Sequence, residues 1–189
     1  MNLQMTAQIP DEFRYMGELY SLIGLKGSSL YTPQDFGITP MMASTACYRG
    51  YVMRYDCVYG QLILDGMSVR TEEAQPVNDI DPFDEAGHFF SHRYENLSLK
   101  TKFSGSMLLG KEFIEAMYVH MGFQRPMAYR TVLELQIQDG DIMATNDLSA
   151  KMEELRNRDS SKDAQLSSRD HNDVMSWIEN AFSLDYDIE

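Results

Sequence analysis

The stretch GSMLLGKE, residues 105–112, decides between two fold classes. Gly105, Gly110 and Lys111 have the spacing of a phosphate-binding loop, which would place them in a parallel α/β protein. However, Glu112 replaces the hydroxyl residue that holds Mg²⁺, and residues 107–109 are apolar where such a loop needs small or polar residues. The stretch therefore predicts a turn and a short apolar strand, followed by a helix that begins at Lys111 and has Glu112 in its first turn.

Two helices are predicted between residues 111 and 158. The first covers residues 111–121, because apolar residues recur there at helical spacing: Phe113, Ile114, Met117, Tyr118 and Met121. The second covers residues 148–158, where Leu148, Met152 and Leu155 lie about one helical turn apart and Asn146 or Asp147 precedes them as a cap.

Two hairpins are also predicted. In residues 131–145, apolar and polar residues alternate over 133–138, Asp139-Gly140 follows as a pair that accepts positive φ, and Ile137 should face Ile142. In residues 49–70, Gly60 marks the turn. A two-residue turn at Tyr59-Gly60 would place Arg54 opposite Asp65, and a three-residue turn would shift that register.

These elements predict an α+β protein. We expect a twisted antiparallel sheet of about six to eight strands packed with two or three helices over residues 1–158. Whether this sheet is partly closed is not decided by the sequence. Loops at 26–45 and 71–93 should cover the edges or one mouth of the sheet. A polar linker at 159–172 then leads to an amphipathic helix and acidic tail at 173–189.

The net charge of −13 over 189 residues constrains the binding partner. A polyanion repels phosphate backbones and anionic lipid heads, so we expect neither nucleic-acid nor membrane binding and favour a basic protein surface. The sequence shows neither a leader-like start nor an apolar stretch long enough to span a bilayer, which predicts a cytoplasmic protein. Cys47 and Cys57 are then expected to stay reduced.

The sequence contains no recognisable catalytic motif, and we assign no catalytic residue, metal or cofactor. Asp84, His88 and His92 have a spacing that could place them on one helix face as metal ligands. Pro82 and Gly87 disfavour a helix there, so chance spacing in a surface loop is the preferred interpretation.

Two hypotheses of function stay open. The first is an acidic, cytoplasmic protein-binding module, such as an inhibitor or immunity-type protein that neutralises a basic partner, or a protein that binds a second copy of itself. Its contact residues would lie in the tail: Trp177, Ile178, Phe182, Asp185 and Asp187. The alternative is a small-molecule-binding protein or enzyme with an aromatic cavity on a curved antiparallel sheet, lined by Tyr48, Tyr51, Tyr55 and His120.

Overall fold

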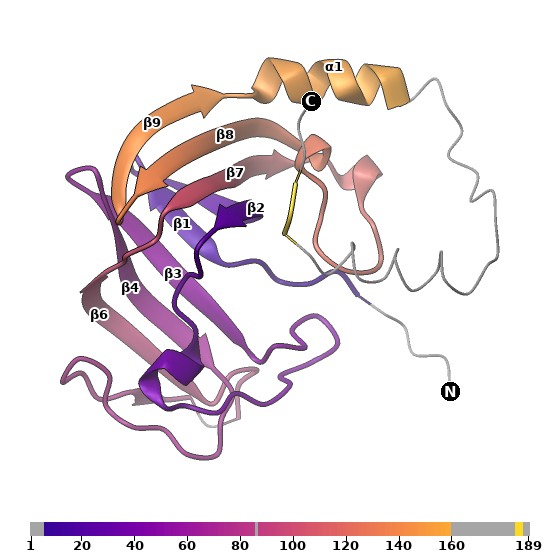
Figure 1. Ribbon diagram of the computed structural model, residues 1–189. Coiled ribbons are helices and arrows are strands. Elements are labelled where there is room, and N and C mark those ends of the chain that lie inside the picture. Colours follow the sequence, from indigo (N-terminus) through magenta and orange to yellow (C-terminus); the bar gives the residue numbers. More distant parts are fainter. Residues whose placement is uncertain (1–5, 86, 160–183, 187–189) are drawn as a thin grey trace, which may run out of the picture.

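The computed structural model describes residues 6–85, 87–159 and 184–186, and β-sheet is the main regular structure of these residues (Figure 1). Nine strands form one sheet: β1 (Glu12–Tyr15), β2 (Glu18–Gly27), β3 (Tyr51–Val58), β4 (Gln61–Val69), β5 (Phe83–Asp84), β6 (His92–Lys100), β7 (Gly105–Phe113), β8 (Tyr129–Gln138) and β9 (Asp141–Asp147). The helices are α1 (Ser149–Asp159) and three short 3₁₀ helices: η1 (Pro33–Phe36), η2 (Glu115–Met117) and η3 (Pro126–Ala128).

The predicted α+β class is wrong. The described residues contain only one α-helix, and the fold is closer to all-β. The main error lies at residues 111–121, where β7 continues to Phe113 and only the 3₁₀ turn η2 follows. Because β8 pairs with β7 as far as Phe113, whereas β2 pairs with it only up to Gly110, the ladder of backbone hydrogen bonds to β8 outweighs the helical spacing of the apolar side chains.

The sheet closes into a ring. Its strand order is β3-β1-β2-β7-β8-β9-β4-β6-β5. A further pairing joins β3, the first strand of that order, to β4 and so closes the ring, while β6 and β5 continue the sheet from β4. All pairs are antiparallel except β1 with β3. The strand pairing between β9 and β4 consists of the single pair Gln61–Asp141, so the ring has its shortest pairing there.

The interior of the ring is packed with apolar side chains. Phe13, Tyr94 and Phe103 are among the largest of them, and each is at most 1% exposed. A second, smaller core forms where α1 packs against β8, and it includes Leu108, Val132 and Met152 (Figure 1). The two loops around residues 26–45 and 71–93 send Ile38 and Val77 into the main core and lie at the lower end of the view in Figure 1.

The stretch that resembles a phosphate-binding loop forms most of strand β7. Its apolar run is explained by burial on both faces, since Met107 and Leu109 join the main core and Leu108 joins the second. Its glycines allow close packing: a Cβ at Gly105 would lie 2.0 Å from the Lys26 carbonyl oxygen, and one at Gly110 would lie 2.7 Å from Ile23 Cδ1.

The residues after Gly110 have structural partners of their own. Lys111 Nζ lies 3.4 Å from Glu18 Oε2, and the hydrogen bond to Glu18 raises the pKa of Lys111. Glu112 is not in a helix as predicted. It has a φ of 62° within β7 and accepts a hydrogen bond from the Thr131 hydroxyl at 3.0 Å.

Both predicted hairpins and the helix at 148–158 are confirmed. Asp139-Gly140 forms a two-residue turn, and Ile137 pairs with Ile142. Tyr59-Gly60 forms the other turn, but Arg54 pairs with Gly66 because a β-bulge displaces Asp65 from the expected register.

The helix is α1, and Asp147 acts at its start. The backbone N–H of Ser149 donates a hydrogen bond to Asp147 Oδ1 at 2.9 Å. Hydrogen bonds from Ser149 lower the pKa of Asp147.

Two residues near the carboxyl end, Leu184 and Tyr186, contact the sheet. The Leu25 N–H donates a hydrogen bond to the Leu184 carbonyl oxygen at 2.8 Å, on the edge of β2. The Tyr186 hydroxyl donates to Glu134 Oε1 at 3.0 Å, and burial raises the pKa of Tyr186 to about 12. The predicted linker at 159–172 and the predicted helix lie almost entirely outside the described residues, and Leu184–Tyr186 are not helical.

Candidate functional site

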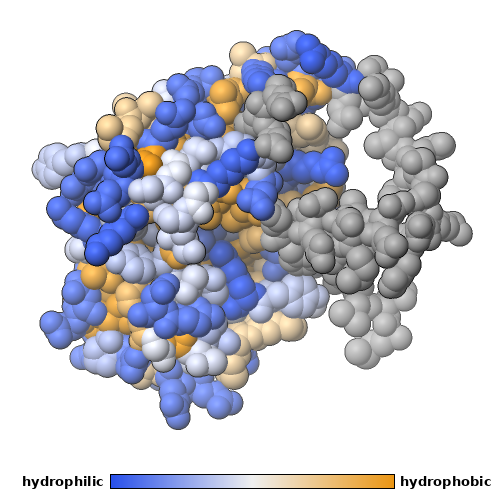
Figure 2. Space-filling view, viewed as in Figure 1, coloured by the Kyte–Doolittle hydropathy of each residue, from blue (hydrophilic) through white to orange (hydrophobic). Residues whose placement is uncertain are grey.

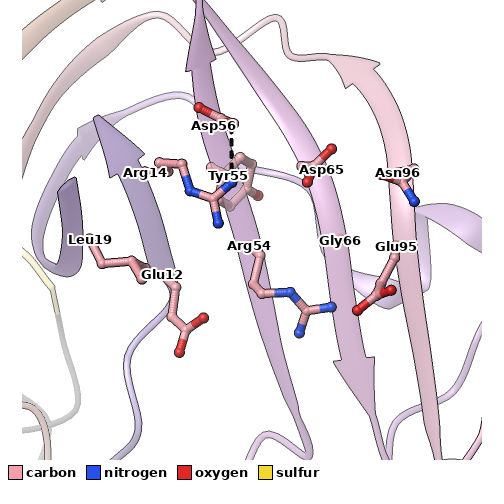
Figure 3. A pocket seen from close by; sticks show the side chains of 10 residues that line it. All are labelled: Glu12, Arg14, Leu19, Arg54, Tyr55, Asp56, Asp65, Gly66, Glu95 and Asn96. Atoms are coloured by element: carbon pink, nitrogen blue, oxygen red, sulfur yellow. Dashed lines mark ion pairs between the residues drawn. The ribbon is translucent and has the colours of Figure 1, made fainter. Parts of the chain in front are cut away.

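A charged cleft of about 290 Å³ lies on the outer face of the sheet, across β1, β3, β4 and β6 (Figure 3). Its charged lining residues are Glu12, Arg14, Arg54, Asp56, Asp65 and Glu95, and its remaining lining residues are Leu19, Tyr55, Gly66 and Asn96. Strand alternation explains this composition, because residues that neighbour buried ones along each strand point outward. We call this feature the charged cleft.

Arg54 forms part of the cleft and is held in place by its neighbours. Its guanidinium donates hydrogen bonds to Ser68 Oγ at 2.8 Å and to the Tyr94 carbonyl oxygen at 2.9 Å, so it reaches from β3 across β4 to β6. Gly66 makes this possible, since a Cβ there would lie 2.8 Å from Arg54 Nη2 and 2.7 Å from the Tyr94 oxygen. The cleft therefore has a fixed cationic group rather than a mobile one.

The carboxylates of the cleft outnumber its cations. Four carboxylates face two guanidiniums, which leaves two negative charges in excess. Arg14 pairs with Asp56 at 3.7 Å, the contact dashed in Figure 3, and Glu95 pairs with Arg93 of β6. Within the described part of the chain, Glu12 and Asp65 have no ion-pair partner. These two carboxylates are thus available to an external cation.

The thiols are poorly suited to nucleophilic chemistry. Burial raises the pKa of Cys47, although Arg49 opposes the shift, and burial together with Asp56 raises the pKa of Cys57 to about 12. A thiol with a raised pKa is protonated near neutral pH, whereas the thiolate is the reactive form. Both cysteines are free.

Asp84, His88 and His92 do not form a metal site. Among residues 6–85, 87–159 and 184–186, no group of three or more His, Cys, Asp or Glu side chains could hold a metal ion. His92 Nδ1 instead lies 2.9 Å from the Ser91 hydroxyl. That hydroxyl also accepts a hydrogen bond from the Thr71 N–H at 2.9 Å, which ties the loop after β4 to the start of β6.

No family model, curated protein or solved structure matches this chain. The chemistry of the charged cleft must therefore be inferred from its own residues. In addition, none of the described helices is both long and apolar enough to cross a membrane.

The aromatic residues proposed for a ligand cavity have other roles. Tyr55 borders the charged cleft, but its ring is 2% exposed and stacks on Phe13 at 4.8 Å in the core. Tyr51 is half-buried, and the Arg49 guanidinium carbon lies over its ring, 4.8 Å from the ring centre. Tyr48 is half-buried, and His120 is exposed and packs edge-on against Tyr118.

Of the predicted tail contacts, only Asp185 falls within the described residues, where it is exposed. Trp177, Ile178, Phe182 and Asp187 lie outside them.

Sequence reasoning missed the charged cleft. It placed Arg54 opposite Asp65 in one register of a hairpin, but it assigned no role to Glu12 or Glu95. The available signal was weak: charged residues alternate with apolar ones in each strand, and Gly66 interrupts β4 next to Asp65. Which strands lie side by side cannot be obtained from such alternation alone.

Proposed function

We propose that this protein is an acidic, cytoplasmic protein-binding module that neutralises a basic partner, and that the charged cleft receives Lys or Arg side chains of that partner. The observation that carries the proposal is the pair Glu12 and Asp65, which face the cleft without a cationic partner among the described residues. An arriving ammonium or guanidinium group would gain charge-assisted hydrogen bonds there.

The charge of the whole chain supports the same proposal. A net charge of −13 creates a field that accelerates encounter with a basic protein and suppresses encounter with polyanions. Hydrophilic residues dominate the face seen in Figure 2, and apolar residues there form only scattered groups. The free thiols of Cys47 and Cys57 are in keeping with a reducing compartment.

The small-molecule alternative gains less support from the structure. A ligand cavity on the concave side of the sheet would require space inside the ring, whereas Phe13, Tyr55, Met107 and their neighbours fill that space. The tail residues 177, 178, 182, 185 and 187 remain a proposed second contact with the partner.

The experiment is affinity purification at low salt from the cell of origin with two matched variants. Glu12→Gln/Asp65→Asn removes the two available carboxylates, and Glu72→Gln/Glu73→Gln removes two exposed carboxylates of a loop outside the charged cleft. Both variants lose the same charge. We expect the first to recover about threefold to tenfold less partner, since exposed charge pairs contribute roughly 0.2–1 kcal/mol each. Equal recovery by the two variants would contradict the proposal.

A further inference from the structure

A second depression, of about 430 Å³, lies at the turn end of β1 and β3 and against β9. Its lining is mostly apolar and consists of Tyr15, Met16, Cys57, Gly60, Ile142, Met143, Ala144 and Thr145. The Tyr15 and Thr145 hydroxyls are hydrogen-bonded at 2.9 Å across it. We call this feature the tip groove. It lies beside the shortest pairing of the ring, where Gln61 and Asp141 form the only β4–β9 pair.

Exposed apolar side chains surround the tip groove. The exposed fractions are 84% for Met16, 101% for Tyr59 and 64% for Met143. Side chains this exposed contribute little burial to folding. Clusters of exposed apolar residues next to a depression are typical of interaction sites.

A comparison of three turns supports a binding role for two of these residues. Met16-Gly17, Tyr59-Gly60 and Asp139-Gly140 have almost the same backbone conformation, with first-residue φ values of 51°, 50° and 49°. Asp is one of the residues that such turns prefer, but Met and Tyr are not. Local turn chemistry therefore does not explain the two residues beside the tip groove, whereas contact with a partner does.

The tip groove is continuous with the charged cleft along two strands. Arg14 and Asp56 line the cleft, and the residues that follow them, Tyr15 and Cys57, line the groove. Leu19, which is 57% exposed, borders the cleft from the same β1–β2 hairpin that carries Met16. A partner seated on the cleft would thus extend over the hairpin tip.

We infer that the tip groove binds an apolar side chain of the same basic partner, on a segment whose flanking Lys or Arg residues reach the charged cleft. This inference rests on the proposed function and adds the second half of the contact surface. A second copy of this chain is a poorer occupant, because each copy has a net charge of −13 and the two would repel one another.

The test uses the full-length chain with ¹³C-labelled methionine methyl groups, followed by NMR. Met16 and Met143 report on the tip groove, and the fully buried Met107 is the internal control. The probes are seven-residue peptides whose three central positions are drawn from Leu, Ile, Met, Phe and Trp, flanked on each side by Lys and Arg. Two control sets replace the central residues with Ser and Gly, or the flanking residues with Gln.

We expect members of the first set to shift the Met16 and Met143 signals at millimolar concentration and to leave Met107 unchanged. The variant Met16→Asn/Tyr59→Asn, which suits the turn conformation better, should raise the dissociation constant at least about tenfold. Its unchanged far-ultraviolet spectrum would separate lost contact from lost fold.

Four results would overturn the inference. Equal binding by the Ser-Gly peptides would leave the charged cleft as the binding site and remove the tip groove from it. Equal binding by the Gln-flanked peptides would refute the proposed basic partner as well. Binding by no member of the first set would exclude the predicted occupant, and concentration-dependent methyl shifts without peptide would assign the groove to a second copy.

Discussion

Replacing Tyr59 with Asn should stabilise the fold. The Tyr59 side chain is 101% exposed, so its removal loses no buried area, and its φ of 50° lies in the left-handed region. That region costs an ordinary residue roughly 1–2 kcal/mol, and Asn avoids part of the cost. We therefore expect Tyr59→Asn to raise the free energy of unfolding by about 0.5–1 kcal/mol, or the melting temperature by roughly 1–4 °C.

The measurement is urea unfolding followed by circular dichroism, with the slope against urea compared as well as the midpoint. Asp139→Asn is the matched control. It changes the corresponding residue of a turn with the same conformation, in which Asp already suits φ = 49°, so it should be nearly neutral. If Tyr59→Asn instead lowered stability by about 1 kcal/mol or more, Tyr59 would support the fold, and the argument from the three turns would be refuted.

Three further predictions concern the interior. Asp11→Asn should cost about 3–5 kcal/mol in urea unfolding, because it breaks the buried pair with Arg49 at 2.6 Å; a loss below 1 kcal/mol would contradict this. Gly110→Ala should cost roughly 1–3 kcal/mol, since its Cβ would lie 2.7 Å from Ile23 Cδ1 and 2.8 Å from Tyr129 Cγ, and an unchanged thermal midpoint would contradict this. The Cys57 thiol, whose pKa is raised to about 12, should react with a disulfide reagent at mildly alkaline pH much more slowly in the native state than after unfolding; equally fast reaction in both states would contradict the raised pKa.

Local patterns predicted local structure well. The preferred turn at Asp139-Gly140 led to the correct register, with Ile137 opposite Ile142, and the apolar spacing at 148–158 identified α1. These signals depend on neighbours within a few residues, so the sequence contains them directly.

Non-local pairing decided the rest and was not visible in one sequence. The apolar spacing of residues 113–121 suggested a helix, but pairing with β8 extends β7 to Phe113. Because of the β-bulge at Asp65, Arg54 pairs with Gly66 instead, and Asp65 lines the charged cleft. The cleft itself requires β1 beside β3, a parallel pair of segments about 40 residues apart, which Glu12 opposite Arg54 illustrates.

The most direct test of the central claim is calorimetric measurement of the affinity for the captured partner at low and high salt. Because Glu12→Gln/Asp65→Asn lacks the two available carboxylates, we expect this variant to bind about threefold to tenfold more weakly than the unmodified chain at low salt. That difference should shrink at high salt, while Glu72→Gln/Glu73→Gln stays within about twofold of the unmodified chain. Equal affinity for both variants at low salt, or a difference that persists unchanged at high salt, would contradict the assignment of the charged cleft as the site that receives the partner's cations.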